Sequence, residues 1–158
     1  PELGGSEYYK LKGYLGASVP KLHASKARKA YYNLTKAMGE GMVKSCHDLS
    51  EGGLAVAAAE MAFAGGCGVE LDLKAVPSKH VSRDDFMLFS ESNSRFLIEV
   101  APRDRGDFED LMRKSCTQIG EVTKKDRMLV HGLNGKVVVD ADIAELRHAW
   151  KKTLNAEA

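Results

Sequence analysis

The sequence predicts an α/β (α+β) domain in which a mixed sheet is covered by helices. Segments with helical periodicity alternate along the chain with short runs rich in β-branched and aromatic residues. Near the end, two such runs flank Asn134-Gly135, a dipeptide that favours a tight hairpin turn. Alternating helices and strands followed by a hairpin indicate a sheet that holds both parallel and antiparallel pairs.

The predicted elements follow the order α-β-α-β-α-β-α-β-β-β-α. In the first helix, apolar residues recur three or four positions apart, Ser25 is the expected N-cap, and Gly39 ends the helix. In the last helix, Asp142 is the expected cap and the apolar face runs from Ile143 to Leu154. The expected ranges are helix 25–40, a strand, turn and helix over about 42–64, strand 69–74, helix 84–89, strand 95–100, helix 104–114, strands 117–123, 127–131 and 136–140, and a helix from 142.

The chain is expected to divide into two unequal parts. Residues 1–22 are expected to be a connector from a preceding domain, since they show no sustained period of 2.0 or 3.6. Residues 23–158 are expected to form a C-terminal α/β domain of ordinary size. The first residue is Pro1 rather than methionine, which favours a piece of a longer polypeptide.

The composition narrows the class of protein. With 23 basic and 22 acidic residues the net charge is +1, which argues against nucleic acid or a membrane as partner. No stretch of the sequence approaches the ~18–20 consecutive apolar residues of a membrane span. The three cysteines, Cys46, Cys67 and Cys116, are odd in number and lack CxxC spacing. They indicate reduced thiols in a cytoplasmic protein rather than a disulfide framework or a zinc site.

The stretch 45–54 carries the strongest chemical signal, because a strand, a polar turn and a helix follow one another there. The helix after the turn is apolar nearly all round, with Glu60 as its one charge, so we expect it in the core. Its first N–H groups and its dipole favour an anion site. The alternative is a structural turn in which Ser50 or Asp48 is an ordinary helix cap.

Two groups of residues are candidates for ligand binding. Asp48, at the end of a strand, offers the hard oxygen that suits Mg²⁺ bridged to phosphate, and Gly52 and Gly53 allow a phosphate to approach the backbone. The spacing lacks the GK[ST] of a P-loop. The run Glu91-Ser92-Asn93 presents a carboxylate, a hydroxyl and an amide, although alone it is typical of a surface turn. The histidines are scattered in sequence, and no residue is assigned a catalytic role.

Four runs taken together resemble the phosphoribosylformylglycinamidine synthase family, and more narrowly its synthetase subunit (subunit II). They are HDLSEGGLA at 47–55, EMA at 60–62, GVELD at 68–72 and FSESNSRF at 89–96. Residues 3–8 and 119–122 also fit, so the resemblance covers essentially the whole chain. In that family, HDVSEGGL with ESNSRF marks the last domain of a duplicated pair, and here Leu49 stands in place of the commoner valine.

The resemblance implies a fold like the C-terminal domain of aminoimidazole ribonucleotide synthase. It also implies ATP-dependent amidation of formylglycinamide ribonucleotide to formylglycinamidine ribonucleotide in purine biosynthesis, with Mg²⁺ and ATP or ADP as cofactors. The implied partners are the remaining domains of the same subunit, a glutaminase subunit that releases ammonia, and a second copy in a homodimer. Because the ATP-binding barrel domain of the family is absent, the chain alone is expected to be inactive.

The resemblance further implies one wall of a nucleotide or phosphate site, the auxiliary one of two. The implied binding residues are Ser50, Gly52, Gly53, Glu91, Ser92 and Asn93, with Asp48 as the metal ligand. The catalytic histidine of the family belongs to another domain, so His47 does not inherit that role. Two alternatives stay open: a stand-alone nucleotide- or phosphate-binding module without turnover, and another enzyme of the same superfamily, such as selenophosphate synthetase, thiamine-monophosphate kinase or the hydrogenase-maturation dehydratase.

Overall fold

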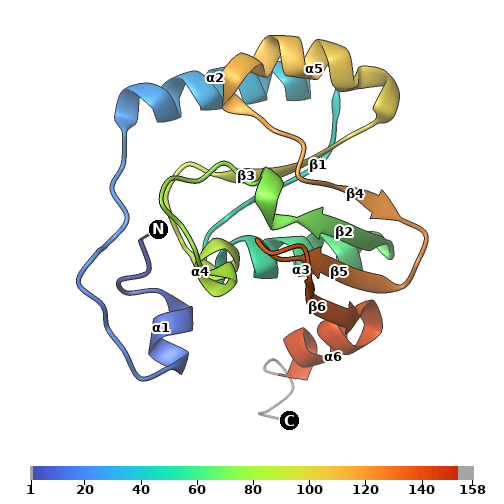
Figure 1. Ribbon diagram of the computed structural model, residues 1–158. Coiled ribbons are helices and arrows are strands. Elements are labelled where there is room, and N and C mark those ends of the chain that lie inside the picture. Colours follow the sequence, from blue (N-terminus) through green and yellow to red (C-terminus); the bar gives the residue numbers. More distant parts are fainter. Residues whose placement is uncertain (1, 153–158) are drawn as a thin grey trace.

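The computed structural model describes residues 2–152 and shows two sheets with helices packed around them (Figure 1). The helices are α1 Glu7–Leu11, α2 Ala24–Gly39, α3 Gly53–Gly65, α4 Asp84–Phe89, α5 Arg105–Met112 and α6 Ile143–Lys152. The strands are β1 Val43–Asp48, β2 Gly68–Asp72, β3 Phe96–Val100, β4 Gly120–Thr123, β5 Arg127–His131 and β6 Val137–Asp142. None of these helices is long and apolar enough to cross a membrane.

The strands form one mixed sheet and one separate antiparallel pair. In the mixed sheet the order is β4-β2-β5-β6, with β2 antiparallel to β4 and parallel to β5, and β5 antiparallel to β6. β1 pairs only with β3, and this register sets Asp48 opposite Phe96. The predicted mixed sheet is confirmed, whereas the separation of β1 and β3 into their own sheet was not predicted. Strand periodicity does not reveal which strands pair.

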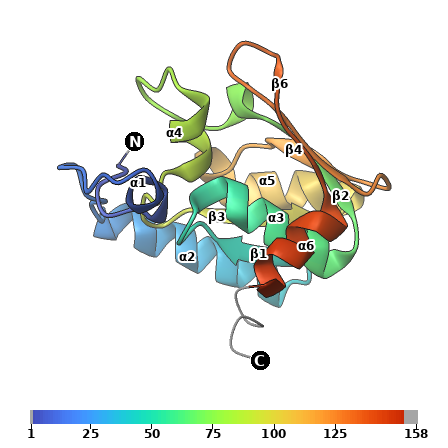
Figure 2. The ribbon, with the colours of Figure 1, turned by 90° about the horizontal axis from the view of Figure 1, so that it is seen from below.

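The apolar helix α3 is the centre of the main core. It contacts α4 and α6 as well as β1, β2 and β3, and Figure 2 shows it between α4 and α6. Leu54 of α3 is almost completely buried and belongs to the same cluster as Leu73 and Val130 from the sheet side. Burial of side chains of this size stabilises the fold by roughly 1.5–3 kcal/mol each. The prediction that this helix lies in the core is confirmed.

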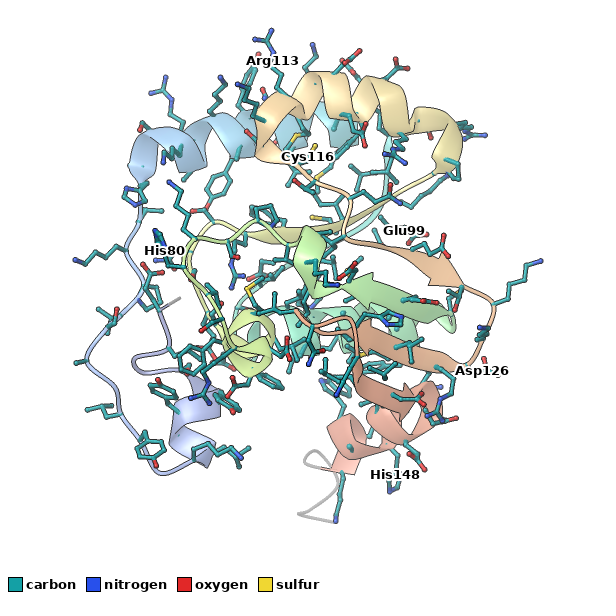
Figure 3. The ribbon with its side chains drawn as sticks, viewed as in Figure 1. His80, Glu99, Arg113, Cys116, Asp126 and His148 are labelled. Atoms are coloured by element: carbon teal, nitrogen blue, oxygen red, sulfur yellow. The ribbon has the colours of Figure 1, made fainter. Side chains whose placement is uncertain are left out.

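A second, smaller core lies on the other side of β1 and β3, under α2 and α5. Leu34 and Ala37 of α2 pack there with Phe108 and Met112 of α5. Cys116 lies between this pair of helices and β3, as Figure 3 shows, and burial raises the pKa of its thiol. All three cysteines of the chain are free thiols. The β1–β3 pair is therefore covered on both faces, by α2 and α5 on one side and by α3 on the other.

The predicted helix and strand positions agree with the structure to within a few residues. Of the two predicted helix caps, one is confirmed and one is wrong. Asp142 caps α6 as predicted, since its Oδ1 accepts hydrogen bonds from the N–H groups of Ala144 and Glu145 (2.8 and 3.2 Å). The prediction of Ser25 as the cap of α2 is wrong. The helix begins one residue earlier, and His23 stands at the N-cap without a side-chain hydrogen bond. Leu154 and the residues after it lie outside the described part of the chain.

The predicted connector contains a short helix, α1, that lies against α4. Ser6 caps α1, and the ring of Tyr8 stacks on Phe89 with centroids 4.8 Å apart. The Tyr8 hydroxyl donates a hydrogen bond to Asp85 (2.7 Å), and the Arg83 guanidinium lowers the pKa of that carboxyl to about 2. A helix of five residues is too short to leave a periodic signal in the sequence. The division into a connector, 1–22, and a domain, 23–158, stays a prediction.

Candidate functional site

The two sequence runs that suggested a ligand site lie against each other in the structure. Because β1 and β3 are neighbours, the turn after β1 meets the loop before β3. The Leu49 N–H donates to the Arg95 carbonyl (3.0 Å), and the Gly52 N–H donates to Glu91 Oε1 (2.9 Å). Residues separated by some forty positions in sequence therefore form one continuous surface, which we call the two-loop surface (residues 48–53 and 90–95).

Glycine is required at 52 and 53 by backbone conformation and by close packing. Gly52 has φ 75° and Gly53 has φ 61°, both in the left-handed region. A Cβ at Gly53 would lie 2.5 Å from the carbonyl oxygen of Ser90, so this glycine lets the second loop approach. Gly52 itself is the N-cap of α3, and no side chain caps the helix. The alternative that Ser50 or Asp48 caps this helix is therefore wrong.

Two N–H groups at the start of α3, those of Gly52 and Gly53, already have partners within the chain. The Gly53 N–H donates to the Ser50 carbonyl (3.0 Å). Glu91 Oε1 accepts from the Gly52 N–H and also from the Glu7 N–H (3.0 Å), which joins α1 to the two-loop surface. The anion at this helix terminus is thus the Glu91 carboxylate. A contact between phosphate and the Gly52 N–H stays a prediction, and it requires Glu91 to move.

Arg95 holds the second loop in shape, a role that the sequence did not reveal. Its Nη2 donates to the carbonyl and hydroxyl oxygens of Ser90, the latter at 3.1 Å, and its Nε donates to the Ser92 carbonyl (3.2 Å). Burial lowers the pKa of Arg95, while the charge of Glu2 opposes that shift. One signal in the sequence could have predicted this role: a single arginine stands directly before an apolar strand. A charged side chain that enters a core needs hydrogen-bond partners there.

Three of the predicted binding residues face solvent at the edge of the two-loop surface. Asp48 has a side chain that is 64% exposed, and Ser50 and Asn93 are exposed as well. Ser92 is half-buried. Within residues 2–152, the side chains of Ser50, Ser92 and Asn93 make no hydrogen bond to the rest of the chain. The structure therefore separates the predicted set into internally bonded residues and residues open to a ligand.

The residues present fit a magnesium ion only as a partial site. In the part of the chain that the structure describes, no group of three His, Cys, Asp or Glu side chains is arranged to hold a metal. Mg²⁺ is usually bound by one or two carboxylates together with substrate phosphates and water. The exposed carboxylate of Asp48 fits that pattern as one ligand, with phosphate oxygens completing the shell.

His47 joins β1 to α3 and α6, and its ring also approaches the Asp48 carboxylate, with Nδ1 3.6 Å from Oδ1. Its Nε2 lies 2.7 Å from Glu60 Oε2, and its Nδ1 lies 2.6 Å from the Asp48 carbonyl. The other oxygen of Glu60 accepts a hydrogen bond from the Trp150 indole (3.0 Å). Burial would lower the pKa of His47, but the hydrogen bonds to Asp48 and Glu60 outweigh it and the pKa is raised. Glu60, the single charge on an apolar helix, thus has two partners.

The remaining histidines lie elsewhere. His80 in the loop before α4 and His148 on α6 are far apart in Figure 3, and His131 pairs with Glu70 on the mixed sheet (2.9 Å). Burial raises the pKa of Cys46 on β1, which leaves it mainly as the unreactive thiol.

The two-loop surface offers carboxylate, hydroxyl, amide and backbone groups, which are suited to binding and orienting a polar ligand.

Solved structures of other proteins share the fold of this chain. Thermotoga maritima PurL complexed with FGAR superposes with a TM-score of 0.73 at 22% identity, covering 82% of this chain and 22% of that one. Escherichia coli HypE, a hydrogenase maturation protein, gives a TM-score of 0.58 at 21% identity over 71% of this chain and 39% of that one. The predicted fold, that of an aminoimidazole-ribonucleotide-synthase-like C-terminal domain, is confirmed.

Sequence comparison identifies the family. Residues 1–132 match the family described as AIR synthase related protein, C-terminal domain, and the chain belongs to it. Among curated relatives, phosphoribosylformylglycinamidine synthase subunit PurL of Moorella thermoacetica is 34% identical over 156 residues, and that of Methanothrix thermoacetophila is 35% identical over 157 residues. These matches cover 98% and 97% of this chain, but only 21% and 20% of the relatives. The resemblance predicted from the sequence is confirmed, and the chain spans about a fifth of the length of these relatives.

Proposed function

We propose that this chain is the C-terminal α/β domain of an ATP-dependent synthetase that converts formylglycinamide ribonucleotide to formylglycinamidine ribonucleotide in purine biosynthesis. The observation that carries the proposal is the match to PurL relatives over nearly the whole chain, at 34–35% identity. The two-loop surface supports it, because the paired motifs that suggested the family meet in space. Alone, the domain has no catalytic activity.

Within such an enzyme, the domain supplies one wall of a nucleotide or phosphate site. Asp48, Ser50 and Asn93, with Ser92 beside them, face the ligand, and Asp48 is one ligand of Mg²⁺. Bound Mg²⁺ would offset the negative charge of the nucleotide phosphates. Gly52, Gly53 and Glu91 keep the two loops at a fixed separation, so that hydroxyl and amide groups are oriented before ligand arrives. Thermotoga maritima PurL has been solved with ATP, ADP and AMPPCP, which supports ATP or ADP as the cofactor.

The partners of the domain follow from the same proposal. They are the remaining domains of the subunit, a glutaminase subunit that supplies ammonia, and a second copy in a homodimer. A structure of PurLQS from Thermotoga maritima supports an assembly of several subunits. Three free thiols suit a reducing, cytoplasmic location.

The experiment that tests the proposal compares the isolated chain with a chimaera. In the chimaera, this chain replaces the matching 156 residues of the Moorella thermoacetica subunit. Formation of formylglycinamidine ribonucleotide is measured with ATP, Mg²⁺ and ammonia. We expect turnover by the chimaera and none by the isolated chain. Turnover by the isolated chain would contradict the proposal, as would a folded chimaera that binds substrate but forms no product.

A further inference from the structure

Positive charge is concentrated in one segment of the chain. Residues 8–39 contain seven Lys or Arg residues and no Asp or Glu, whereas the chain as a whole has a net charge of +1. The rest of the molecule is therefore net acidic. All seven side chains are exposed, and they are Lys10, Lys12, Lys21, Lys26, Arg28, Lys29 and Lys36. The near balance of the whole composition conceals a strongly basic, exposed segment.

Exposed apolar side chains lie in the same segment. Leu11 is 83% exposed and Leu15 is 80% exposed, and Tyr14, Val19 and Leu22 are all more than half exposed. Leu11 is the last residue of α1, and the other four belong to the trace between α1 and α2 that runs along one edge of the molecule in Figure 1. A run of large apolar side chains left in water usually marks a surface that another molecule covers.

The backbone of this trace is hydrogen-bonded to the residues that precede α1, which fixes its path. The Gly4 N–H donates to the Ser18 carbonyl (2.7 Å), and the Gly5 N–H donates to the Leu15 carbonyl (2.8 Å). These hydrogen bonds hold the backbone near Leu15 while its side chain stays exposed. We call the exposed side chains of residues 11–32 the docking strip.

The strip continues onto α2 as a groove. Ala24, Ser25, Arg28, Lys29 and Tyr32 line an open depression of about 770 Å³ on one face of the helix. Lys10 and Lys36, outside the strip, pair with Glu7 and Glu40. Among the residues that the structure describes, the basic side chains of the strip form no ion pair. Lys12 lies over the Tyr8 ring, 5.8 Å from its centroid, and the positive charges of the strip that lack a carboxylate partner are available to acidic groups outside the domain.

We propose that the docking strip binds an acidic protein surface with an apolar centre, carried by the part of the synthetase that lies outside this domain. The proposal rests on the proposed function, because the relatives are about five times as long as this chain. Protein interfaces combine apolar side chains at the centre with charged ones at the rim, and the strip carries both kinds, with Lys12 and Lys21 near Leu15 and Leu22 in sequence. Acidic groups opposite those lysines would speed encounter and fix the register.

The other polyanionic partners fit the strip less well. Membrane-surface segments are usually helices with one apolar face, whereas residues 12–23 form no helix. Nucleic-acid interfaces are polar and strongly basic, and they do not need Leu11, Leu15, Val19 and Leu22 in water. A strip that exposes both large apolar and basic side chains is best matched by a protein surface.

The first test uses the isolated chain, because the proposal requires that the apolar side chains do not stabilise the domain. The triple variant Leu11→Ser, Leu15→Ser, Leu22→Ser is expected to keep its Tm within about 1 °C of the original. The buried control Leu34→Ser should lower the Tm by roughly 10 °C or more. A comparable loss in the triple variant would overturn the proposal, because the side chains would then belong to the fold. Binding of the chain to single-stranded DNA or to phosphatidylserine vesicles would assign the strip to those partners and overturn it as well.

The second test measures amide hydrogen exchange in the chimaera with the Moorella thermoacetica subunit. Residues 11–22 are expected to exchange at least about tenfold more slowly in the chimaera than in the isolated chain. The variant Lys21→Glu, Arg28→Glu, Lys29→Glu should restore fast exchange, and the control Lys124→Glu, Lys125→Glu on the β4–β5 turn should not. Equal exchange in both proteins would overturn the docking proposal. If residues 11–22 exchange slowly in a chimaera that does not catalyse the amidation, the proposed function is contradicted and the docking proposal stands.

Discussion

The two-loop surface contains two kinds of residue that the sequence could not tell apart. Gly52, Gly53, Glu91 and Arg95 are tied to one another and to the backbone, and we call them the scaffold residues. Asp48, Ser50 and Asn93 stand in solvent beside them, and we call them the rim residues. Positions that shape the loops therefore lie next to the positions that we propose for ligand binding. Substitution separates them, because scaffold changes should alter stability and rim changes should alter binding.

The largest expected effect is that of Gly53→Ala. The added Cβ would lie 2.5 Å from the Ser90 carbonyl oxygen, and the residue would have to keep φ near 61°. We expect a loss of about 3 kcal/mol in the free energy of unfolding, measured by urea denaturation. Gly65→Ala is the matched control, since a Cβ there meets nothing within 4 Å, and it should change the stability by less than about 1 kcal/mol. Equal effects of the two substitutions would show that the second loop does not press on Gly53.

The next largest effect is expected for Arg95→Met. This change removes the donors to Ser90 and Ser92 and leaves buried oxygens without partners. A loss of about 2 kcal/mol is expected from denaturation curves. Arg28→Met, on the exposed face of α2, should leave stability within about 0.5 kcal/mol. If Arg95→Met were as mild as that control, Arg95 would not be a scaffold residue.

Glu91→Ala tests whether the helix terminus can receive an external anion. Loss of the acceptor for the Gly52 and Glu7 N–H groups should cost about 1 kcal/mol, while Glu91→Gln should cost less. If phosphate can occupy the place of the carboxylate, Glu91→Ala should bind inorganic phosphate more tightly than the original chain in calorimetry. Unchanged phosphate affinity would remove the Gly52 N–H from the list of binding groups.

A smaller effect is expected from the titration of His47. Its pKa is raised in the folded chain above the usual value of 6.5, so its contribution to stability is fully present below that value and is lost as pH rises through the folded pKa. As the pH rises from about 6.5 through the raised folded pKa of His47, the free energy of unfolding should therefore fall by more in the original chain than in His47→Gln. Glu60→Gln, which removes the charge opposite His47, should likewise make the free energy of unfolding depend less on pH. An identical pH profile in all three proteins would contradict the ion pair.

The smallest effect on stability is expected for the rim. Asp48→Ala should change the free energy of unfolding by less than about 0.5 kcal/mol, because the side chain is mostly in water. The same change in the chimaera should weaken binding of Mg-ADP by roughly tenfold, as expected for loss of one charged ligand. Calorimetry with and without Mg²⁺ is the measurement, and unchanged affinity would remove Asp48 from the site.

The sequence predicted the parts of the fold that depend on local pattern. Helices with a clear apolar face, the cap at Asp142 and the hairpin at Asn134-Gly135 were all found where expected, because periodicity, side-chain caps and turn chemistry act over a few residues. The pairing of β1 with β3 was not predicted, because it joins segments about fifty residues apart. The short α1 was missed because five residues give no period.

The candidate site shows the same division between local and distant information. The motifs pointed to two loops that meet in the structure, and their role in binding stays a prediction. The sequence could not show that Glu91 already accepts a hydrogen bond from the Gly52 N–H. It also could not show that Arg95 points back onto its own loop, or that Glu60 pairs with His47. A lone charge on an apolar helix was a usable sign that a partner existed. The identity of that partner required the tertiary structure.

The parallel pairing of β2 with β5 has a consequence for synthesis on the ribosome. β2 at residues 68–72 has no partner strand until β4 and β5, residues 120–131, have been made. Until then, the neighbouring apolar helix α3 has no complete sheet to cover it. Pairing between distant strands is slow and leaves hydrophobic surface exposed meanwhile. The nascent chain should therefore depend on chaperones most strongly while the segment between β2 and β5 emerges.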